Sequence, residues 1–251
     1  MEEKVKAVIG NLVGKKHVYL LNSGKEAMSQ IADLFRYKEF VIQDQCYSLL
    51  HRAVDSYTDV KTNFGLIELK DLLRKCNNKI LIVNGLSGYF AEQPNSEIIE
   101  ICKDKNCFIL NDVTGSIGLN SARLGNYAFC QFDKESPINL GFGAFIASNT
   151  ELRINEDFDK SKLPDLHDRL VNLDNRLKYL YWISDKVKKD LNVFDILHKD
   201  KRGLNVLVKF DAQSEKESLI KYCERHQLGY TLNPKYIKQS ENLISIDINK
   251  K

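Results

Sequence analysis

An aspartate that follows a continuously apolar run is the residue of this sequence best placed to do chemistry. The run 107–110, Cys-Phe-Ile-Leu, is typical of a central strand in a parallel sheet, and Asp112 follows it closely. Ligands of open α/β sheets bind at the carboxyl ends of such strands. A buried carboxylate is costly unless a cation meets it, so Asp112 indicates a ligand site. The alternative is that Asp112 is only a turn residue or a helix N-cap.

A second candidate lies at residues 22–26, Asn-Ser-Gly-Lys-Glu, between a predicted strand and a predicted helix. A Ser-Gly turn at a helix N-terminus offers free backbone N–H groups and the positive end of the helix dipole, which suit a phosphate. The alternative is an ordinary N-cap, in which Ser23 caps the helix and Glu26 completes a capping box. The segment alone favours the N-cap.

The loop 132–143 joins two apolar runs and contains Lys134. A lysine in such a loop could form a Schiff base if desolvation lowers its pKa enough to free the amine. The alternative is a solvated lysine paired with Asp133 or Glu135. Tyr47, which follows another predicted strand, could stack on a planar cofactor.

Alternating strand and helix patterns must position these residues. Strands are predicted at 17–21, 40–42, 58–62, 80–83 and 107–110, and helices at 25–35, 49–56, 66–76 and 96–103. This alternation predicts an α/β fold with a parallel, doubly wound sheet.

The rhythm changes after Asp112. Two strands at 128–132 and 143–147 are separated only by a loop, a polar linker follows at 149–164, and a long helix is predicted at 165–191. A strand at 204–210, a helix at 214–226 and a strand at 243–248 complete the chain. We therefore predict a large domain at residues 1–150 and a reduced small α+β domain at 151–251.

The order of these pieces resembles the large domain of fold-type I pyridoxal-phosphate (PLP) enzymes, and most closely the DegT/DnrJ/EryC1 sugar aminotransferases. Residues 22–28 resemble that family's Asn-Ser-Gly-Thr-x-Ala-Leu phosphate turn, and residues 84–89 its His-x-x-Gly loop. Residues 111–118 resemble its Glu-Asp-Ala-Ala-x-x-x-Gly segment. The resemblance covers roughly residues 10–150.

The resemblance implies a three-layer α-β-α sandwich with a mainly parallel sheet, followed by a small α+β domain. It implies that Asp112 pairs with the pyridine nitrogen of pyridoxal 5'-phosphate, that Ser23, Gly24 and Lys25 hold the phosphate, and that Tyr47 stacks on the ring. It further implies transfer of an amino group from a small-molecule donor to a keto-sugar or keto-acid, in a homodimer.

The position of the Schiff-base lysine leaves two alternatives open. The family usually places this lysine five positions before the first glycine of a Gly-rich turn, and counting back five from Gly141 reaches Ser136. In the first alternative Glu135 and Ser136 are an insertion, and Lys134 is the catalytic lysine. In the second, Ser136 replaces the lysine in the cofactor site, and the chain is a catalytically degenerate binding or partner subunit.

Three neighbouring positions also depart from the family pattern. Gln131 stands where the family has a phosphate-binding serine, Phe142 stands in place of a glutamate, and Ala144 in place of a glycine. These departures favour the degenerate alternative.

The composition limits the function further. The net charge of +3 arises from 37 basic and 34 acidic residues that are well mixed, so we expect no nucleic-acid partner. We expect no membrane span, because no apolar run is long enough, and no signal peptide, because the first residues are charged. The six cysteines have neither CxxC nor zinc-type spacing, which predicts a reduced, cytoplasmic protein without a metal site.

Overall fold

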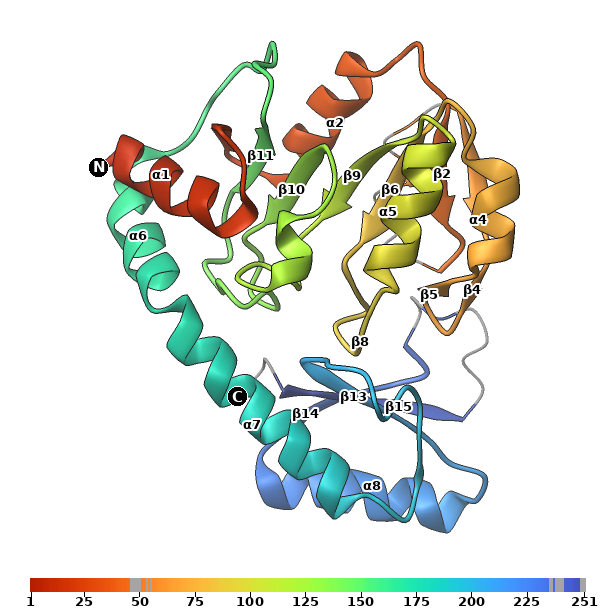
Figure 1. Ribbon diagram of the computed structural model, residues 1–251. Coiled ribbons are helices and arrows are strands. Elements are labelled where there is room, and N and C mark those ends of the chain that lie inside the picture. The colour runs from red at the N-terminus through yellow and green to blue at the C-terminus, as the bar shows by residue number, and fades with distance from the viewer. Residues whose placement is uncertain (46–50, 53, 55, 235–236, 238–241, 249–251) are drawn as a thin grey trace.

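A seven-stranded sheet forms the centre of the structure, a computed structural model that describes residues 1–251 except 46–50, 53, 55, 235–236, 238–241 and 249–251 (Figure 1). The strands, in spatial order, are β1 (His17–Leu21), β11 (Ala144–Ser148), β10 (Tyr127–Gln131), β9 (Phe108–Asp112), β6 (Ile80–Asn84), β2 (Phe40–Gln43) and β3 (Tyr57–Val60). β11 pairs antiparallel with both of its neighbours, whereas the remaining pairs are parallel. Six strands therefore end at the same edge of the sheet.

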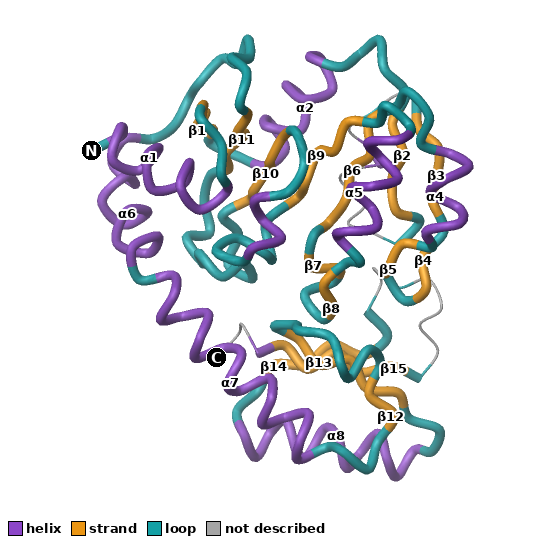
Figure 2. The backbone as a smooth tube through the Cα atoms, viewed as in Figure 1, coloured by secondary structure: helices purple, strands orange, loops and turns teal. Residues whose placement is uncertain are grey.

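Helices cover both faces of this sheet because the strand residues alternate between two apolar surfaces. Ile82 of β6 packs with α2 (Gly24–Leu34), whereas its neighbours Leu81 and Val83 pack with α4 (Leu69–Lys75) and α5 (Asn95–Asp104). Val18 and Leu20 of β1 pack with α1 (Glu2–Val13). Figure 2 shows the resulting layers, and the predicted three-layer α-β-α sandwich is confirmed.

The last part of the chain forms a second, antiparallel sheet. Its strands, in spatial order, are β12 (Asp195–Ile196), β13 (Asn205–Lys209), β15 (Leu243–Asp247) and β14 (Gly229–Leu232). The chain reaches this sheet through α6 (Leu163–Val171) and α7 (Leu173–Asp190), and α8 (Gln213–His226) packs against it (Figure 1). The boundary at residue 150 stays a prediction.

Backbone hydrogen bonds join the second sheet to the hairpin that follows β6 of the seven-stranded sheet. The Tyr89 carbonyl accepts from the Asn205 N–H at 2.8 Å and from the Leu204 N–H, and the Glu92 N–H donates to the Arg202 carbonyl at 3.2 Å. Residues 202–205 and 89–92 together form what we call the joint. These bonds are between backbone groups, and the side chains of Phe90 and Ala91 add apolar contacts with Leu207 and Leu243 of the second sheet.

The structure differs from two of the predicted helices. The chain expected to be helical from residue 66 begins instead with a hairpin of β4 (Thr62–Asn63) and β5 (Leu66–Ile67), because Phe64 and Gly65 turn it with φ values of 44° and 81°. The single helix predicted at 165–191 is α6 and α7, which are joined at Asn172. The Asn172 side chain donates to the Asp168 carbonyl at 2.9 Å, which ends α6 there. Half of the helix predicted at 49–56 lies outside the described residues.

Several short or surface elements have no counterpart in the sequence prediction. They are α1, the hairpin of β7 (Leu86–Ser87) and β8 (Ala91–Glu92), β12, β14, and the 3₁₀ turns η1 (Asn120–Arg123) and η2 (Lys160–Lys162). Cys76, Cys102, Cys107, Cys130 and Cys223 are buried free thiols. In the described part of the chain, no cluster of His, Cys, Asp or Glu could hold a metal, and no helix is long and apolar enough to cross a membrane.

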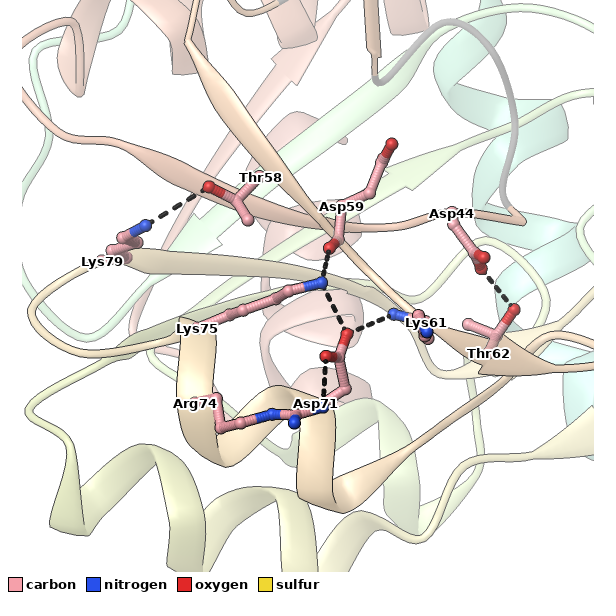
Figure 3. A network of polar contacts seen from close by, with 9 residues as sticks. All are labelled: Asp44, Thr58, Asp59, Lys61, Thr62, Asp71, Arg74, Lys75 and Lys79. Carbon is pink, nitrogen blue, oxygen red and sulfur yellow. Dashed lines mark hydrogen bonds and ion pairs between the residues drawn. The ribbon is translucent and has the colours of Figure 1, made fainter.

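A polar network around Asp71 fastens α4 to the edge of the sheet (Figure 3). The Asp71 side chain is 3% exposed, accepts from the Lys61 N–H at 2.9 Å, and forms ion pairs with Lys75 at 2.7 Å and Arg74 at 3.0 Å. Lys75 also donates to the Asp59 carbonyl at 2.7 Å, which ties the helix to β3. Burial raises the pKa of Asp71, but these hydrogen bonds and charges outweigh it and leave the pKa below its usual value.

Replacing Asp71 with alanine is expected to lower the free energy of unfolding by about 2 kcal/mol at pH 7, because it removes several charged hydrogen bonds at once. Urea denaturation measures this loss. A carboxylate with a lowered pKa stabilises the fold above its unfolded-state pKa, so the difference from wild type should shrink as the pH falls through the folded pKa. Lys70→Ala, an exposed change on the same helix, is the control. A loss that is equal at pH 3 and pH 7 would contradict the ionic origin.

Candidate active site

Asp112 occupies the last position of β9, at the edge where the parallel strands end. Its side chain is 6% exposed, and its oxygens accept from the Thr114 N–H at 3.0 Å and from the Asn84 amide at 3.5 Å. Burial raises its pKa, and only the bonds from Thr114 oppose that shift. Among the described residues no cation forms an ion pair with Asp112. A cationic ligand would therefore meet a carboxylate that the protein leaves uncompensated.

Gln131 connects Asp112 with the beginning of α2. The Gln131 N–H donates to the Thr114 hydroxyl at 3.0 Å, and β10, which ends at Gln131, pairs with β9. The Gln131 side chain packs on Gly24, since a Cβ atom added to Gly24 would lie 2.5 Å from its amide oxygen. The ends of β1, β9 and β10 thus meet at one place.

The start of α2 shows the N-cap that residues 22–26 predicted. Ser23 is the N-cap, and its hydroxyl accepts from the Glu26 N–H at 3.1 Å, as the N-cap alternative predicts. Gly24 is buried, whereas Ser23 and Lys25 are exposed. The backbone N–H groups of Gly24 and Lys25 belong to the first turn, which has no partners within the helix. A phosphate at this turn stays a prediction, and Tyr47 lies outside the described residues.

The loop between β10 and β11 places its lysine and serine differently. Ser136 is fully buried, and its hydroxyl donates to the Asp133 carbonyl at 2.9 Å and accepts from the Asn139 N–H at 3.3 Å. Lys134 is exposed, and its side chain lies along Gly141, with Cε 3.2 Å from where a Cβ atom would be. No ion pair joins Lys134 to Asp133 within the described residues. Of the two candidates for the lysine position, Ser136 is therefore the buried one and Lys134 the exposed one.

Asp133 is a second carboxylate at this edge, which the sequence analysis considered only as a partner for Lys134. Burial, followed by the charges of Glu135 and Asp112, raises the pKa of Asp133 to about 6, although N–H groups of Ser136 and Glu135 oppose the shift. The sequence alone predicted that Asp133 follows a strand. Only the pairing of β9 with β10, which the structure shows, revealed that Asp133 lies near Asp112.

Tyr89 is a third member of the site. Its ring lies against Gly115, with Cδ1 2.8 Å from where a Cβ atom would be, and its backbone has a φ of 64°. Burial, then the charges of Asp133 and Asp112, raises the pKa of Tyr89 well above its usual value. Tyr89 closes the loop 84–89, but nothing in the sequence marks its positive φ.

Asp133→Asn is expected to stabilise the fold by about 1 kcal/mol at pH 7.5, after the pKa shift is discounted for solvent screening. A carboxylate with a raised folded-state pKa binds protons more readily when folded, so its ionisation costs stability as the pH rises through about 6. Urea denaturation at pH 4 and pH 7.5 separates the two cases. The gain should be present at pH 7.5 and nearly absent at pH 4; a gain of the same size at both would point to packing instead.

Comparisons with known proteins add the fold and no closer relationship. No protein-family model and no curated protein sequence matches this chain. A NifS-like protein from Rickettsia africae superposes with a TM-score of 0.73 at 16% identity, covering 98% of this chain and 81% of that one. Serine palmitoyltransferase from S. paucimobilis, solved with a bound PLP–myriocin aldimine, gives a TM-score of 0.74 at 12% identity, covering 98% and 71%. The Sphingomonas wittichii serine palmitoyltransferase gives 0.74 at 12%, covering 97% and 69%.

Identities this low establish the architecture alone. The resemblance to fold-type I enzymes is confirmed at the level of the fold, whereas the DegT/DnrJ/EryC1 subgroup stays a prediction. The chain has the fold-type I transferase architecture of these NifS-like and serine palmitoyltransferase structures.

Proposed function

We propose that this protein binds pyridoxal phosphate, or a closely similar phosphorylated pyridine, without a covalent bond to a lysine. The observation that carries the proposal is the buried Asp112, which has hydrogen bonds from Thr114 and Asn84 but no ion pair among the described residues. A pyridinium N–H would supply the missing cation. The solved neighbours that contain PLP support this choice of ligand.

The residues at the start of α2 suit the phosphate. The first-turn N–H groups of α2 and the helix dipole attract an anion, while the Gln131 side chain covers the Cβ side of Gly24. The Gln131 side chain packs on Gly24 with its amide oxygen nearest, where the resembled family has a serine hydroxyl. Asp112 therefore suits the ring nitrogen, and the first turn of α2 suits the phosphate.

The position of the Schiff-base lysine does not fit an aminotransferase. PLP supplies an aldehyde and an electron-withdrawing ring, and amino transfer through it needs a lysine amine to bind the aldehyde and carry the proton. Ser136 is buried where the resemblance places that lysine, and Lys134 is exposed. We therefore favour a catalytically degenerate homologue that acts as a binding protein or partner subunit.

An aminotransferase that uses Lys134 is the second candidate. Lys134 lies in the loop that the resemblance assigns to the catalytic lysine, and its side chain runs along Gly141 of the adjoining turn. In this case the substrates would be a small-molecule amino donor and a keto-sugar or keto-acid. For both candidates we propose that the protein is a homodimer in the cytoplasm.

Titration of the purified protein with PLP, followed by borohydride reduction and peptide mass spectrometry, tests both candidates. We expect reversible binding that dialysis removes, no reduced adduct on any lysine of the loop, and binding at least about tenfold weaker in Asp112→Asn. Asp211→Asn, an exposed change in the second sheet's unit, is the control and should bind as wild type.

Two other outcomes would decide against the proposal. A stoichiometric adduct on Lys134 that is lost in Lys134→Ala would establish the aminotransferase-type attachment instead. Absence of any PLP binding by the wild-type protein would overturn both candidates.

A further inference from the structure

A pocket of about 230 Å³ lies between α1 and residues 118–123, away from the edge that holds Asp112. Three apolar residues (Val8, Leu12 and Leu119) and three polar ones (Asn11, Asn120 and Arg123) line it, together with Gly118. Binding sites for small molecules commonly combine an apolar wall with a few convergent polar groups. Neither the sequence pattern nor the proposed function accounts for this pocket.

The polar groups of the pocket are not used elsewhere in the described structure. The Arg123 side chain lies over Gly14, the left-handed C-cap of α1, with Nε 3.4 Å from where a Cβ atom would be. The negative end of the α1 dipole holds the guanidinium there. Within the described residues, the side chains of Arg123, Asn11 and Asn120 have no hydrogen-bond or ion-pair partner. All three residues are exposed, so their N–H groups face solvent and can donate to a ligand.

A second cation lies beside Arg123. Lys15 is 7% exposed, and its ammonium donates to the Arg123 carbonyl at 3.1 Å, with no carboxylate partner among the described residues. Burial, and then the charge of Arg123, lowers the pKa of Lys15. Two neighbouring cations that have no carboxylate partner in the described structure create a positive potential, which favours the binding of an anion in this pocket.

The charge of the surroundings selects this pocket over its neighbour. A larger cavity of about 510 Å³ shares Asn11, and three lysines (Lys6, Lys15 and Lys16) and three glutamates (Glu3, Glu151 and Glu156) line it. Its carboxylates offset the charge of its lysines, so it offers an anion no net attraction. The smaller pocket has no acidic residue in its lining.

We propose that this pocket binds a small carboxylate with a short apolar body. The planar guanidinium of Arg123 matches a carboxylate bidentately, and the amides of Asn11 and Asn120 donate to its oxygens. Val8, Leu12 and Leu119 cover the apolar body, which inorganic anions lack. Lys15 does not line the pocket, and its positive charge attracts the ligand without direct contact.

Calorimetric titration with isovalerate and its uncharged analogue isovaleramide tests the proposal on the full-length protein. We expect isovalerate to bind at least about tenfold more tightly than the amide, a difference of about 1.4 kcal/mol. Arg123→Gln should abolish that preference and Lys15→Met should reduce it. Arg153→Gln, an exposed arginine outside the pocket, should behave as wild type. Because buried Lys15 could be needed for folding, Asn120→Ala serves as a second variant, and circular dichroism verifies each fold.

Three results would overturn the proposal. Equal binding of isovalerate and isovaleramide, or no binding of either, would remove the role of charge. Unchanged binding in Arg123→Gln would place the anion elsewhere. Inorganic phosphate that binds as tightly as isovalerate would show that the apolar wall contributes nothing and would exclude the proposed ligand class.

Discussion

Replacing Ser136 with lysine is expected to give the protein a covalent, borohydride-reducible bond to pyridoxal phosphate that the wild-type chain lacks. Ser136 is fully buried five residues before Gly141, where the resembled enzymes carry their lysine. An amine held beside a bound aldehyde reacts with a high effective concentration, so we expect at least about 100-fold more reduced adduct than in wild type. Mass spectrometry of the digested, reduced protein should place it at residue 136.

Two controls make this experiment decisive. Ser161→Lys adds a lysine at an exposed serine outside the site and measures adventitious labelling. Lys134→Ala in the Ser136→Lys background should leave the adduct in place. An adduct in Ser136→Lys no more abundant than in Ser161→Lys, although circular dichroism and PLP binding are retained, would contradict the assignment of position 136 to the cofactor site.

Gly203→Ala is expected to lower the free energy of unfolding by about 3 kcal/mol, because overpacking against an immobile neighbour forces the backbone apart. A Cβ atom at Gly203 would lie 2.2 Å from the Phe90 carbonyl oxygen and 2.4 Å from its carbon. These are main-chain atoms of the joint, so rotation of a side chain cannot relieve the clash. Urea denaturation measures the loss.

Lys199→Ala, an exposed change close to Gly203 in the chain, is the matched control and should stay within about 0.5 kcal/mol of wild type. Hydrogen exchange adds a local measurement: the Leu204 and Asn205 amides, which donate to Tyr89, should lose protection in Gly203→Ala. Wild-type protection in the variant would show that the joint tolerates a side chain.

The central strands of the sheet were readable from the sequence because they are buried and therefore mostly apolar. Residues 17–21 and 80–83 fall within β1 and β6, and Asp112 lies at a strand end as predicted. The order of the strands was not readable in the same way. β11 inserts between β1 and β10 in the opposite direction, and no periodicity within a strand reports which strand will be its neighbour.

The parts of the fold and of the site that the sequence analysis missed depend on backbone conformation and tertiary packing more than on residue type. The turn at Phe64 and Gly65, which replaces the beginning of a predicted helix, needs positive φ values that phenylalanine rarely adopts. Tyr89 likewise enters the site through a left-handed backbone. Asp133 looked like an ordinary loop charge until the pairing of β9 with β10 placed it near Asp112. Local pattern predicts elements, whereas these contacts arise from tertiary packing.

Tyr89 connects two regions of the molecule through its side chain and its backbone. Its ring lies against Gly115 in the field of Asp112 and Asp133, while its carbonyl holds the amides of residues 204 and 205. Tyr89 therefore belongs both to the edge that holds Asp112 and to the joint that holds the second sheet. If a bound ligand shifts the ring and the carbonyl together, ligand affinity and the docking of the second sheet are linked, and reciprocity then requires each to affect the other equally.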